Sequence, residues 1–330
     1  MLLDFLAIGD IVTEPFIKLK EAEVHCDKGS GICTLCMRFG DKIPYESSTL
    51  VAAVGNASNA SVAAARLGLK AALHSYVGDD RYGTECIEVL KKEGVGTEYM
   101  VTEGGKKTNY HYVLWYGNER TILVKHEEFS YEIPKLNHEP KWIYLSSLAA
   151  NSLPYHQELM RFLDTVPNTR LAFQPGTFQM KLGADALLPL YKRSDLFVCN
   201  KEEAARILEL SSVPPIELLL SSMQALGPSI VVITDGTNGA YALADTKRYR
   251  IPMYPDSRAP FERTGAGDAF SSTVTAALAI GIPLEEALLW GPINSMAVVQ
   301  EVGAQKGLLT RAQLQAYLTS APPEYCLSEF

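Results

Sequence analysis

The stretch Arg263-Thr264-Gly265-Ala266-Gly267-Asp268-Ala269-Phe270 joins a glycine-rich turn to a carboxylate and to a helix-like segment that runs to residue 280. The glycines let the backbone turn freely, so the N–H groups of Gly265, Ala266 and Gly267 can face one anion. The N-terminus of the following helix adds its partial positive charge. Asp268 would then lie beside the anion as a candidate base. The alternative is an ordinary turn in which Asp268 only caps the helix.

The composition describes a globular protein with a large core. The 330 residues are 47% hydrophobic and 21% charged, and the net charge is −8. An acidic chain without a basic stripe argues against nucleic-acid and membrane partners. We find no apolar run long enough to span a bilayer and no signal peptide at the N-terminus, so we expect a cytoplasmic protein with reduced cysteines.

Strand-like and helix-like segments alternate along most of the chain, which is typical of βαβ units and a mainly parallel sheet. The predicted strands are residues 71–77, 142–145, 171–173, 195–199 and 230–234, and the predicted helices are residues 58–67, 84–93, 268–280, 284–290, 293–301 and 311–318.

Two stretches do not follow this alternation. Residues 11–49 have no helical period, and residues 109–125 read as a hairpin that turns at Gly117-Asn118. The first arm of the hairpin has large apolar groups on both faces, so each face needs a cover. A substrate cleft and a second subunit would supply the two covers, or one face packs on the main domain.

One cysteine cluster has the spacing of metal ligands. Cys33 and Cys36 are separated by two residues, and His25 and Cys26 precede them. A structural zinc site normally takes two well-spaced pairs, whereas His25 and Cys26 are adjacent. Zinc and reduced thiols therefore both stay open, with thiols favoured.

Five motifs, in this order along the chain, resemble those of the ribokinase-like (PfkB) family of carbohydrate and nucleoside kinases. They are Gly55-Asn56-Ala57-Ser58-Asn59-Ala60, Gly78-Asp79-Asp80-Arg81-Tyr82-Gly83, Asn200-Lys201-Glu202-Glu203-Ala204, Thr234-Asp235-Gly236-Thr237-Asn238-Gly239-Ala240, and residues 264–268. The resemblance implies a single three-layer α/β/α domain over residues 1–330, with a small β lid at about 11–49 and 105–126. It also implies transfer of the ATP γ-phosphate to a hydroxyl group.

The resemblance makes Asp268 the general base and the amides of Gly265, Ala266 and Gly267 the anion hole. This agrees with phosphoryl-transfer chemistry, in which catalysis is mostly positioning and charge stabilisation. The implied nucleotide site consists of Asn200, Thr234, Gly236, Asn238, Gly239, Gly265, Gly267 and Asn294. The adenine would lie against Asn294, Ala297 and Val298, although these also suit an ordinary helix core.

Asn200 and Glu203 are three residues apart at the start of a predicted helix, so both can face one side. An amide and a carboxylate suit a hydrated Mg²⁺, which takes few direct protein ligands. A capping box is the alternative. The resemblance favours magnesium.

The implied acceptor site begins at the first helix. Asn56 and Asn59 carry amides that can bind sugar hydroxyls, and Gly55 leaves room for backbone contact. Asn59 also suits a helix cap. Family members usually place an aspartate where this chain has Glu14, and Asp10 is an additional carboxylate nearby.

Several residues depart from the family pattern. Val54 replaces a glycine of the first signature, and Glu262-Arg263 precede Thr264 where members commonly have Asp-Thr. Arg263 brings a cation to the region that in many members holds a monovalent cation, which argues against potassium activation. Arg120, in the second hairpin arm, suits an anionic substrate, the leaving phosphate or simple solvation.

The sequence therefore predicts a kinase that uses ATP and Mg²⁺ to phosphorylate a sugar or nucleoside, with ribose-type acceptors favoured and a ketohexose next. A homodimer through the lid is expected. The non-enzymatic alternative is a sugar- or nucleotide-binding protein that has lost turnover through the changes at Glu14 and Arg263.

Overall fold

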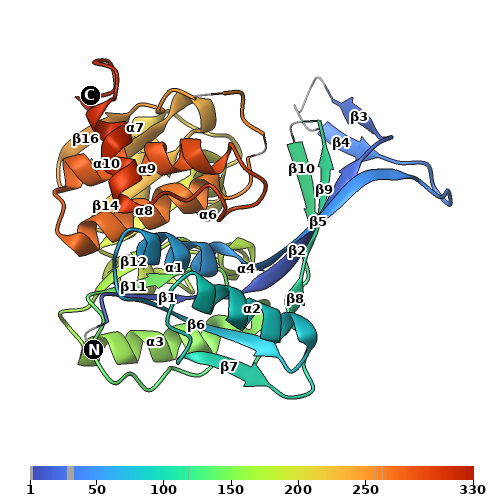
Figure 1. Ribbon diagram of the computed structural model, residues 1–330. Helices are drawn as coiled ribbons and strands as arrows, with labels where there is room; N and C mark the ends of the chain where they lie inside the picture. The colour runs from blue at the N-terminus through green and yellow to red at the C-terminus, as the bar shows by residue number, and fades with distance from the viewer. Residues whose placement is uncertain (1–2, 28–32, 118, 257, 262) are drawn as a thin grey trace.

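The structure is a computed structural model that describes residues 3–27, 33–117, 119–256, 258–261 and 263–330. A large α/β body carries a small sheet that projects from one side (Figure 1). The strands of the body are β1 (Phe5–Ile8), β6 (Ala71–Gly78), β7 (Met100–Glu103), β11 (Trp142–Leu145), β12 (Arg170–Phe173), β13 (Leu196–Asn200), β14 (Ile230–Thr234), β15 (Ala240–Ala244), β16 (Lys247–Ile251) and β17 (Ser328–Glu329). The α-helices are α1 (Asn56–Arg66), α2 (Arg81–Lys92), α3 (Leu153–Thr165), α4 (Thr177–Leu182), α5 (Leu188–Arg193), α6 (Lys201–Ile207), α7 (Ile216–Ala225), α8 (Ala266–Ile280), α9 (Leu284–Val298) and α10 (Arg311–Thr319), and the short 3₁₀ helices are η1 (Ala150–Ser152) and η2 (Gly236–Asn238).

The strands of the body form one sheet in the order β17-β16-β15-β14-β13-β12-β11-β1-β6-β7. The neighbours from β7 to β14 pair in parallel, and β15, β16 and β17 extend the edge antiparallel. Strand β1 shows how the core is divided, because Phe5 and Ala7 pack into the layer of α1, α8 and α9, whereas Leu6 and Ile8 pack into the layer of α3 and α7. The predicted three-layer α/β/α fold is confirmed.

Helix α9 differs from its prediction. Residues 284–290 and 293–301 were expected to form two helices, but one helix runs from Leu284 to Val298 with Pro292 inside it. A proline inside a helix removes a hydrogen bond and costs stability locally. Here Leu288, Trp290 and Ile293 are fully buried, so packing on both sides of the proline outweighs that cost. No helix of the described chain has the length and apolar character needed to cross a membrane.

The small sheet contains β2 (Val12–Leu19), β5 (Tyr45–Val54), β9 (Tyr112–Tyr116) and β10 (Glu119–Leu123) in the order β10-β9-β2-β5, with β8 (Asn109–Tyr110) paired to β2. The predicted hairpin is present, with Tyr116 opposite Glu119. Gly117 lies between them, and Asn118 of the predicted turn lies outside the described residues. The Trp115 ring contacts Phe261 of the body at 5.0 Å between centroids, so part of this sheet packs on the main domain.

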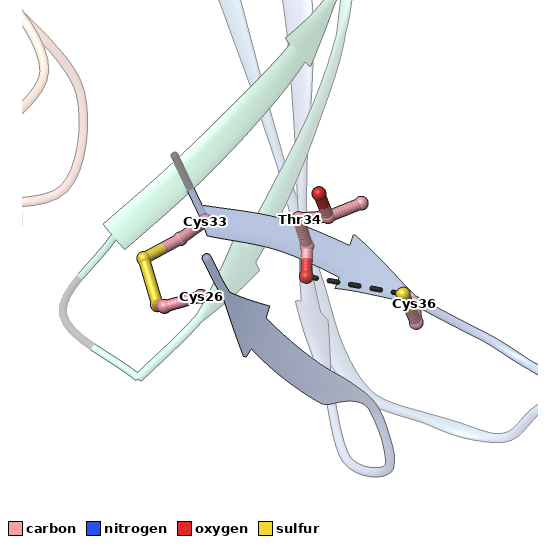
Figure 2. Close-up of a disulfide and its surroundings, with 4 residues drawn as sticks. All are labelled: Cys26, Cys33, Thr34 and Cys36. Carbon is pink, nitrogen blue, oxygen red and sulfur yellow. Dashed lines mark hydrogen bonds between the residues drawn. A yellow bond between two sulfur atoms is a disulfide. The ribbon is translucent and has the colours of Figure 1, made fainter. Parts of the chain in front are cut away.

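A second hairpin, β3 (Glu23–Cys26) and β4 (Cys33–Cys36), lies at the far end of the small sheet (Figure 1). Cys26 and Cys33 face each other across it and form a disulfide (Figure 2). The zinc hypothesis for His25, Cys26, Cys33 and Cys36 is therefore wrong, as is the expectation that all six cysteines are reduced. Cys33 and Cys36 are three residues apart on a strand, where successive side chains alternate, so they point to opposite faces.

Candidate functional site

The glycine-rich turn at residues 264–268 lies at the N-terminus of α8. Gly265 is the N-cap residue, with φ 79° in the left-handed region. A Cβ at Gly265 would lie 2.3 Å from the Cβ of Ala304, so only glycine fits there. A Cβ at Gly267 would meet nothing within 4 Å, so that position is open. Asp268 is the acidic residue in the first helical turn.

Two cavities of about 300 Å³ each meet at this turn. Thr234, Arg263 and Gly267 line both of them. We call them the apolar cavity and the polar cavity. The apolar cavity is lined further by Gly236, Gly239, Met253, Tyr254, Asp256, Phe270, Pro292, Ser295, Met296 and Val299 among others. The polar cavity is lined further by Glu14, Gly55, Asn56, Asn59, Arg120, Ile122, Gln174, Asn200, Glu203, Gly265 and Asp268 among others.

Asp268 lies in the polar cavity between two amides. Asn59 Nδ2 donates to one carboxylate oxygen at 2.8 Å, and Gln174 Nε2 donates to the other at 3.1 Å. Burial raises the pKa of the Asp268 carboxyl, although these two hydrogen bonds and the charge of Arg120 act in the opposite direction. The carboxylate is therefore held in one orientation, with a proton affinity above that of an ordinary aspartate.

The amide of Asn59 is already used within the protein. Its Oδ1 accepts a hydrogen bond of 3.0 Å from Gln305 Nε2, which orients its Nδ2 toward Asp268. The helix cap of α1 is Gly55 rather than Asn59. Asn59 therefore positions the candidate base, whereas Asn56 remains a cavity residue suited to binding hydroxyls.

The two N-terminal carboxylates are in different surroundings. Glu14 lines the polar cavity, and its Oε1 lies 3.5 Å from His111 Nδ1. Asp10 is buried and does not line that cavity. Its carboxylate lies 2.6 Å from His126 Nδ1 and accepts a bond from the Tyr131 hydroxyl at 2.8 Å. Glu14 thus lies at the predicted acceptor site, whereas Asp10 belongs to a buried hydrogen-bond network with His126 and Tyr131 outside that cavity.

Asn200 and Glu203 form the capping box of α6. Asn200 Oδ1 accepts from the Glu203 N–H at 2.7 Å, and Glu203 Oε2 accepts from the Asn200 N–H at 2.9 Å. Burial raises the pKa of Glu203, and the negative charge of Asp268 adds to this rise. Both residues also line the polar cavity, so capping and a ligand-facing position coexist. In the described ranges, no three His, Cys, Asp or Glu side chains form a ready metal cluster.

Part of the predicted nucleotide site does not line the apolar cavity. Asn294 is fully buried, donates to Thr273 Oγ1 at 2.7 Å and accepts from the Leu309 N–H at 2.9 Å. Neither it nor Ala297 or Val298 lines the cavity. The helix face that does so carries Pro292, Ser295, Met296 and Val299, at the i, i+3, i+4, i+7 spacing of one helix side. Asn294, Ala297 and Val298 lie on another side of the same helix.

Only some residues of the 234–239 turn line the apolar cavity. Thr234, Gly236 and Gly239 line the apolar cavity. Asn238 is outside that lining, and its Nδ2 donates to Asp235 Oδ2 at 3.2 Å. Glu262, the acidic residue of the predicted second signature, lies outside the described residues. Arg263 is described. Burial raises the pKa of Asp256, and the positive charge of Arg263 only partly offsets this rise.

Comparison with known proteins decides the family. The model of the pfkB family carbohydrate kinases matches residues 32–311. The chain belongs to the pfkB family. A ribokinase of Bacillus subtilis (strain 168) is 30% identical over 276 residues, which cover 80% of this chain and 87% of that protein.

Solved structures show the same fold as this pfkB family chain. A nucleoside kinase of Methanocaldococcus jannaschii superposes with a TM-score of 0.78 at 18% identity, covering 97% of this chain and 99% of that one. An Arabidopsis thaliana ribokinase complexed with ribose and ATP superposes with a TM-score of 0.75 at 16% identity, covering 96% and 99%. As a pfkB family member, the protein is a phosphotransferase that acts on a sugar hydroxyl.

Several site residues of this pfkB family chain were missed from sequence. Gln174 follows β12 directly, so the rule that points to Thr234 after β14 could also have found it. Gln305 comes from a loop 246 positions from Asn59 and has no local signal. His111 and His126 come from the hairpin region, and only the folded chain places them beside Glu14 and Asp10.

Proposed function

We propose that the protein transfers the γ-phosphate of ATP to a hydroxyl of a sugar or nucleoside, with ribose-type acceptors favoured. The observation that carries this proposal is the meeting of the two cavities at Thr234, Arg263 and Gly267. One cavity suits a flat base, the other suits a polyhydroxylated acceptor, and the helix N-terminus between them suits a phosphate. Asp268 lies on the acceptor side of this junction.

In the proposed mechanism, Asp268 accepts the proton of the attacking hydroxyl. Asn59 and Gln174 keep its carboxylate in place, so that positioning is settled before the acceptor binds. The amides of Gly265, Ala266 and Gly267 face the transferring phosphoryl group at the start of α8. Arg263, shared by both cavities, adds a positive charge on the path of that group.

Asn200 and Glu203 would hold the hydrated Mg²⁺ that accompanies the nucleotide. The donor set fits, because Glu203 lines the cavity and no described Lys, Arg or His lies within ion-pair distance of it. Mg²⁺ binds with several waters and few protein ligands, so the capping box does not exclude it. When bound, the ion neutralises charge on the phosphate oxygens.

The small sheet would act as a lid. Glu14 from β2 and Arg120 and Ile122 from β10 already reach the polar cavity. Exposed apolar side chains of the sheet, among them Tyr45, Leu50, Tyr112 and Leu123, suit a homodimer formed through the lid. A cytoplasmic location, where ATP is available, belongs to the same proposal.

The direct test is incubation of the protein with ATP, Mg²⁺ and a panel of ribose, fructose and nucleosides, with Asp268→Asn as the control. We expect acceptor-dependent ADP release by the native chain and almost none by the variant. Ribose should be a better acceptor than fructose; the reverse would favour the ketohexose alternative. No acceptor-dependent ADP across the panel would refute the kinase function. Replacing sodium by potassium should leave the rate unchanged, because Arg263 already brings a cation to the site.

A further inference from the structure

Tyr144 of β11 is a fully buried residue that contacts the amide oxygen of Gln174. It is not among the described residues that line the polar cavity. Its hydroxyl donates to Gln174 Oε1 and lies 2.7 Å from Ser271 Oγ of α8. Gln174 in turn donates from Nε2 to Asp268 Oδ1 at 3.1 Å. Tyr144 is thus connected to the proposed base through a single amide.

This connection determines which end of the Gln174 amide faces Asp268. An amide oxygen only accepts hydrogen bonds, whereas the amide nitrogen only donates them. Ser271 Oγ also donates to Gln174 Oε1 at 2.9 Å, but the same hydroxyl lies 2.9 Å from the carbonyl oxygen of Gly267. A serine hydroxyl has one proton to share between these acceptors. The proton of Tyr144 is therefore the one that keeps the Gln174 oxygen occupied and its nitrogen turned toward Asp268.

The Tyr144 hydroxyl is a dependable donor. Burial raises the pKa of Tyr144 well above the ordinary value for tyrosine, and the negative charge of Asp268 adds to this rise. The hydroxyl therefore keeps its proton at any pH at which the protein is expected to work. The ring is also packed against Phe5 in a stacked contact, at 5.8 Å between centroids. A neutral donor on a buried strand thus lies behind the amide.

Asp268 is held in the same way at its other oxygen. Gln305 Nε2 donates to Asn59 Oδ1 at 3.0 Å, and Asn59 Nδ2 donates to Asp268 Oδ2 at 2.8 Å. Each oxygen of the carboxylate therefore accepts from an amide whose own oxygen accepts from a buried donor. Hydrogen bonds to the ionised carboxylate favour that form, so both amides oppose the effect of burial on the pKa of Asp268.

We propose that Tyr144 is a positioning residue for phosphoryl transfer, because its hydroxyl fixes the Gln174 amide with the N–H toward Asp268. Tyr144 acts through Gln174. Without the hydroxyl, the amide can turn its oxygen toward Asp268, where it repels the carboxylate and favours the protonated form. This inference rests on the proposed kinase function, in which Asp268 must be ionised to accept the proton of the attacking hydroxyl.

The first test is Tyr144→Phe, which removes the hydroxyl and keeps the ring. In the full-length protein with ATP, Mg²⁺ and ribose, we expect kcat to fall about tenfold, with both KM values unchanged. The acid limb of the pH profile of kcat/KM should move to higher pH by about one pH unit, because ionised Asp268 has lost a donor. A merely structural role would lower the melting temperature without moving this limb. An unmoved limb would overturn the proposal.

A second substitution shows whether Tyr144 acts through Gln174. Gln174→Met removes the amide at similar volume, and it should itself move the acid limb to higher pH. Adding Tyr144→Phe to Gln174→Met should move the limb no further, because residues that act through one shared contact are not additive. A second movement of equal size would overturn the proposal.

Tyr249→Phe is the matched control. The Tyr249 hydroxyl donates to Glu285 Oε1 at 3.0 Å, so the variant also removes a tyrosine hydroxyl that is bonded to a side-chain oxygen. Tyr249 is outside the described linings of both cavities. We expect the kcat and the acid limb of this variant to equal those of the native protein. A shift of the limb in Tyr249→Phe as large as that in Tyr144→Phe would show that the shift is not specific to the network and would overturn the proposal.

A titration without turnover separates this inference from the kinase proposal. Carbon NMR follows the carboxyl of Asp268, whose signal is identified by its loss in Asp268→Asn. Its titration midpoint should be higher in Tyr144→Phe and in Gln174→Met than in the native protein. If no acceptor released ADP but the midpoint rose, the kinase function would fail while the positioning network stood. An unchanged midpoint in Tyr144→Phe, or in Gln174→Met should Tyr144→Phe not fold, would refute the network even if the protein turned over.

Discussion

The apolar and polar cavities share one wall but offer a ligand different interactions. Met253, Phe270 and Met296 give the apolar cavity a hydrophobic surface that can enclose a flat ring through dispersion and burial. Glu14, Asn56 and Arg120 give the polar cavity directional donors and acceptors. The first surface tolerates variation in side chains of similar volume, whereas the second loses binding when one polar group is misplaced.

The contrast between the two cavities suggests which residues select each substrate and which carry out phosphoryl transfer. The shared wall is formed by Thr234, Arg263 and Gly267, and Gly267 lies at the N-terminus of α8, where a phosphate is favoured irrespective of what it is attached to. In the proposed reaction the proton to be moved belongs to the acceptor, and Asp268, the proposed base, lines the polar cavity. Acceptor choice should therefore depend on side chains from the small sheet, and nucleotide choice on α9 and the 253–256 loop.

The largest effect is expected from Asp268→Asn, which should lower kcat by about 10²–10⁴-fold while both substrates still bind. The proposed mechanism requires ionised Asp268. Because burial raises its pKa, activity should fall with decreasing pH at a higher pH than for an ordinary aspartate. The pH profile of kcat/KM measures this. An acid limb at or below the usual aspartate range would contradict the burial of this group.

The next largest effect concerns the shared wall. Gly267→Ala adds a methyl group that meets no protein atom within 4 Å, so the fold should tolerate it. The methyl would intrude where both cavities meet and displace the phosphate, lowering kcat by about 100-fold. Thermal unfolding should show little change. Unaltered turnover would mean that the phosphate does not pass Gly267.

Substitutions of Glu203 test the magnesium site proposed in the polar cavity. Glu203→Gln keeps a side chain able to complete the capping box but removes the charge, so we expect a roughly tenfold loss of apparent Mg²⁺ affinity with the helix intact. Glu203→Ala removes both, and it should lower the melting temperature as well. A Mg²⁺ titration of ADP release compares the two. If Glu203→Gln left the Mg²⁺ dependence unchanged, the carboxylate would serve only as a cap.

The smallest effect should come from the apolar side. Met253→Ala removes a partly exposed side chain of the apolar cavity and should raise the KM for ATP several-fold without changing the KM for the acceptor. Met37→Ala is the matched control, because Met37 is similarly exposed but lies beyond β4 in the small-sheet region. Steady-state kinetics with each substrate varied in turn would check this. A change in acceptor KM would show that the two cavities are not independent.

Much of the fold follows from local pattern. Strands β11 and β14 begin and end where alternation and apolar runs predict, because parallel strands buried on both faces are continuous apolar segments. Long-range packing decides the exceptions. Helix α9 continues through Pro292, and the side of it that lines the apolar cavity depends on how it packs against α8.

The candidate site divides in the same way. Gly265 and Asp268 could be chosen from sequence because a turn that opens onto a helix has local chemistry of its own. Gln174 could be chosen too, because it follows a strand directly. Gln305 and His111 could not, since they meet Asn59 and Glu14 only in the folded chain. The Cys26–Cys33 bond likewise depends on the pairing of β3 with β4.

The sequence by itself determined the α/β class, the anion-binding turn and its carboxylate, because each depends on residues that are neighbours in the chain. The tertiary structure decided which side chains share a cavity with that turn. The Asp10 carboxylate is buried against Tyr131, and the Asn59 amide is oriented toward Asp268. The Nε of Arg120 is buried without a hydrogen-bond acceptor among the described residues. These outcomes depend on contacts between residues up to 246 positions apart, which no local pattern encodes.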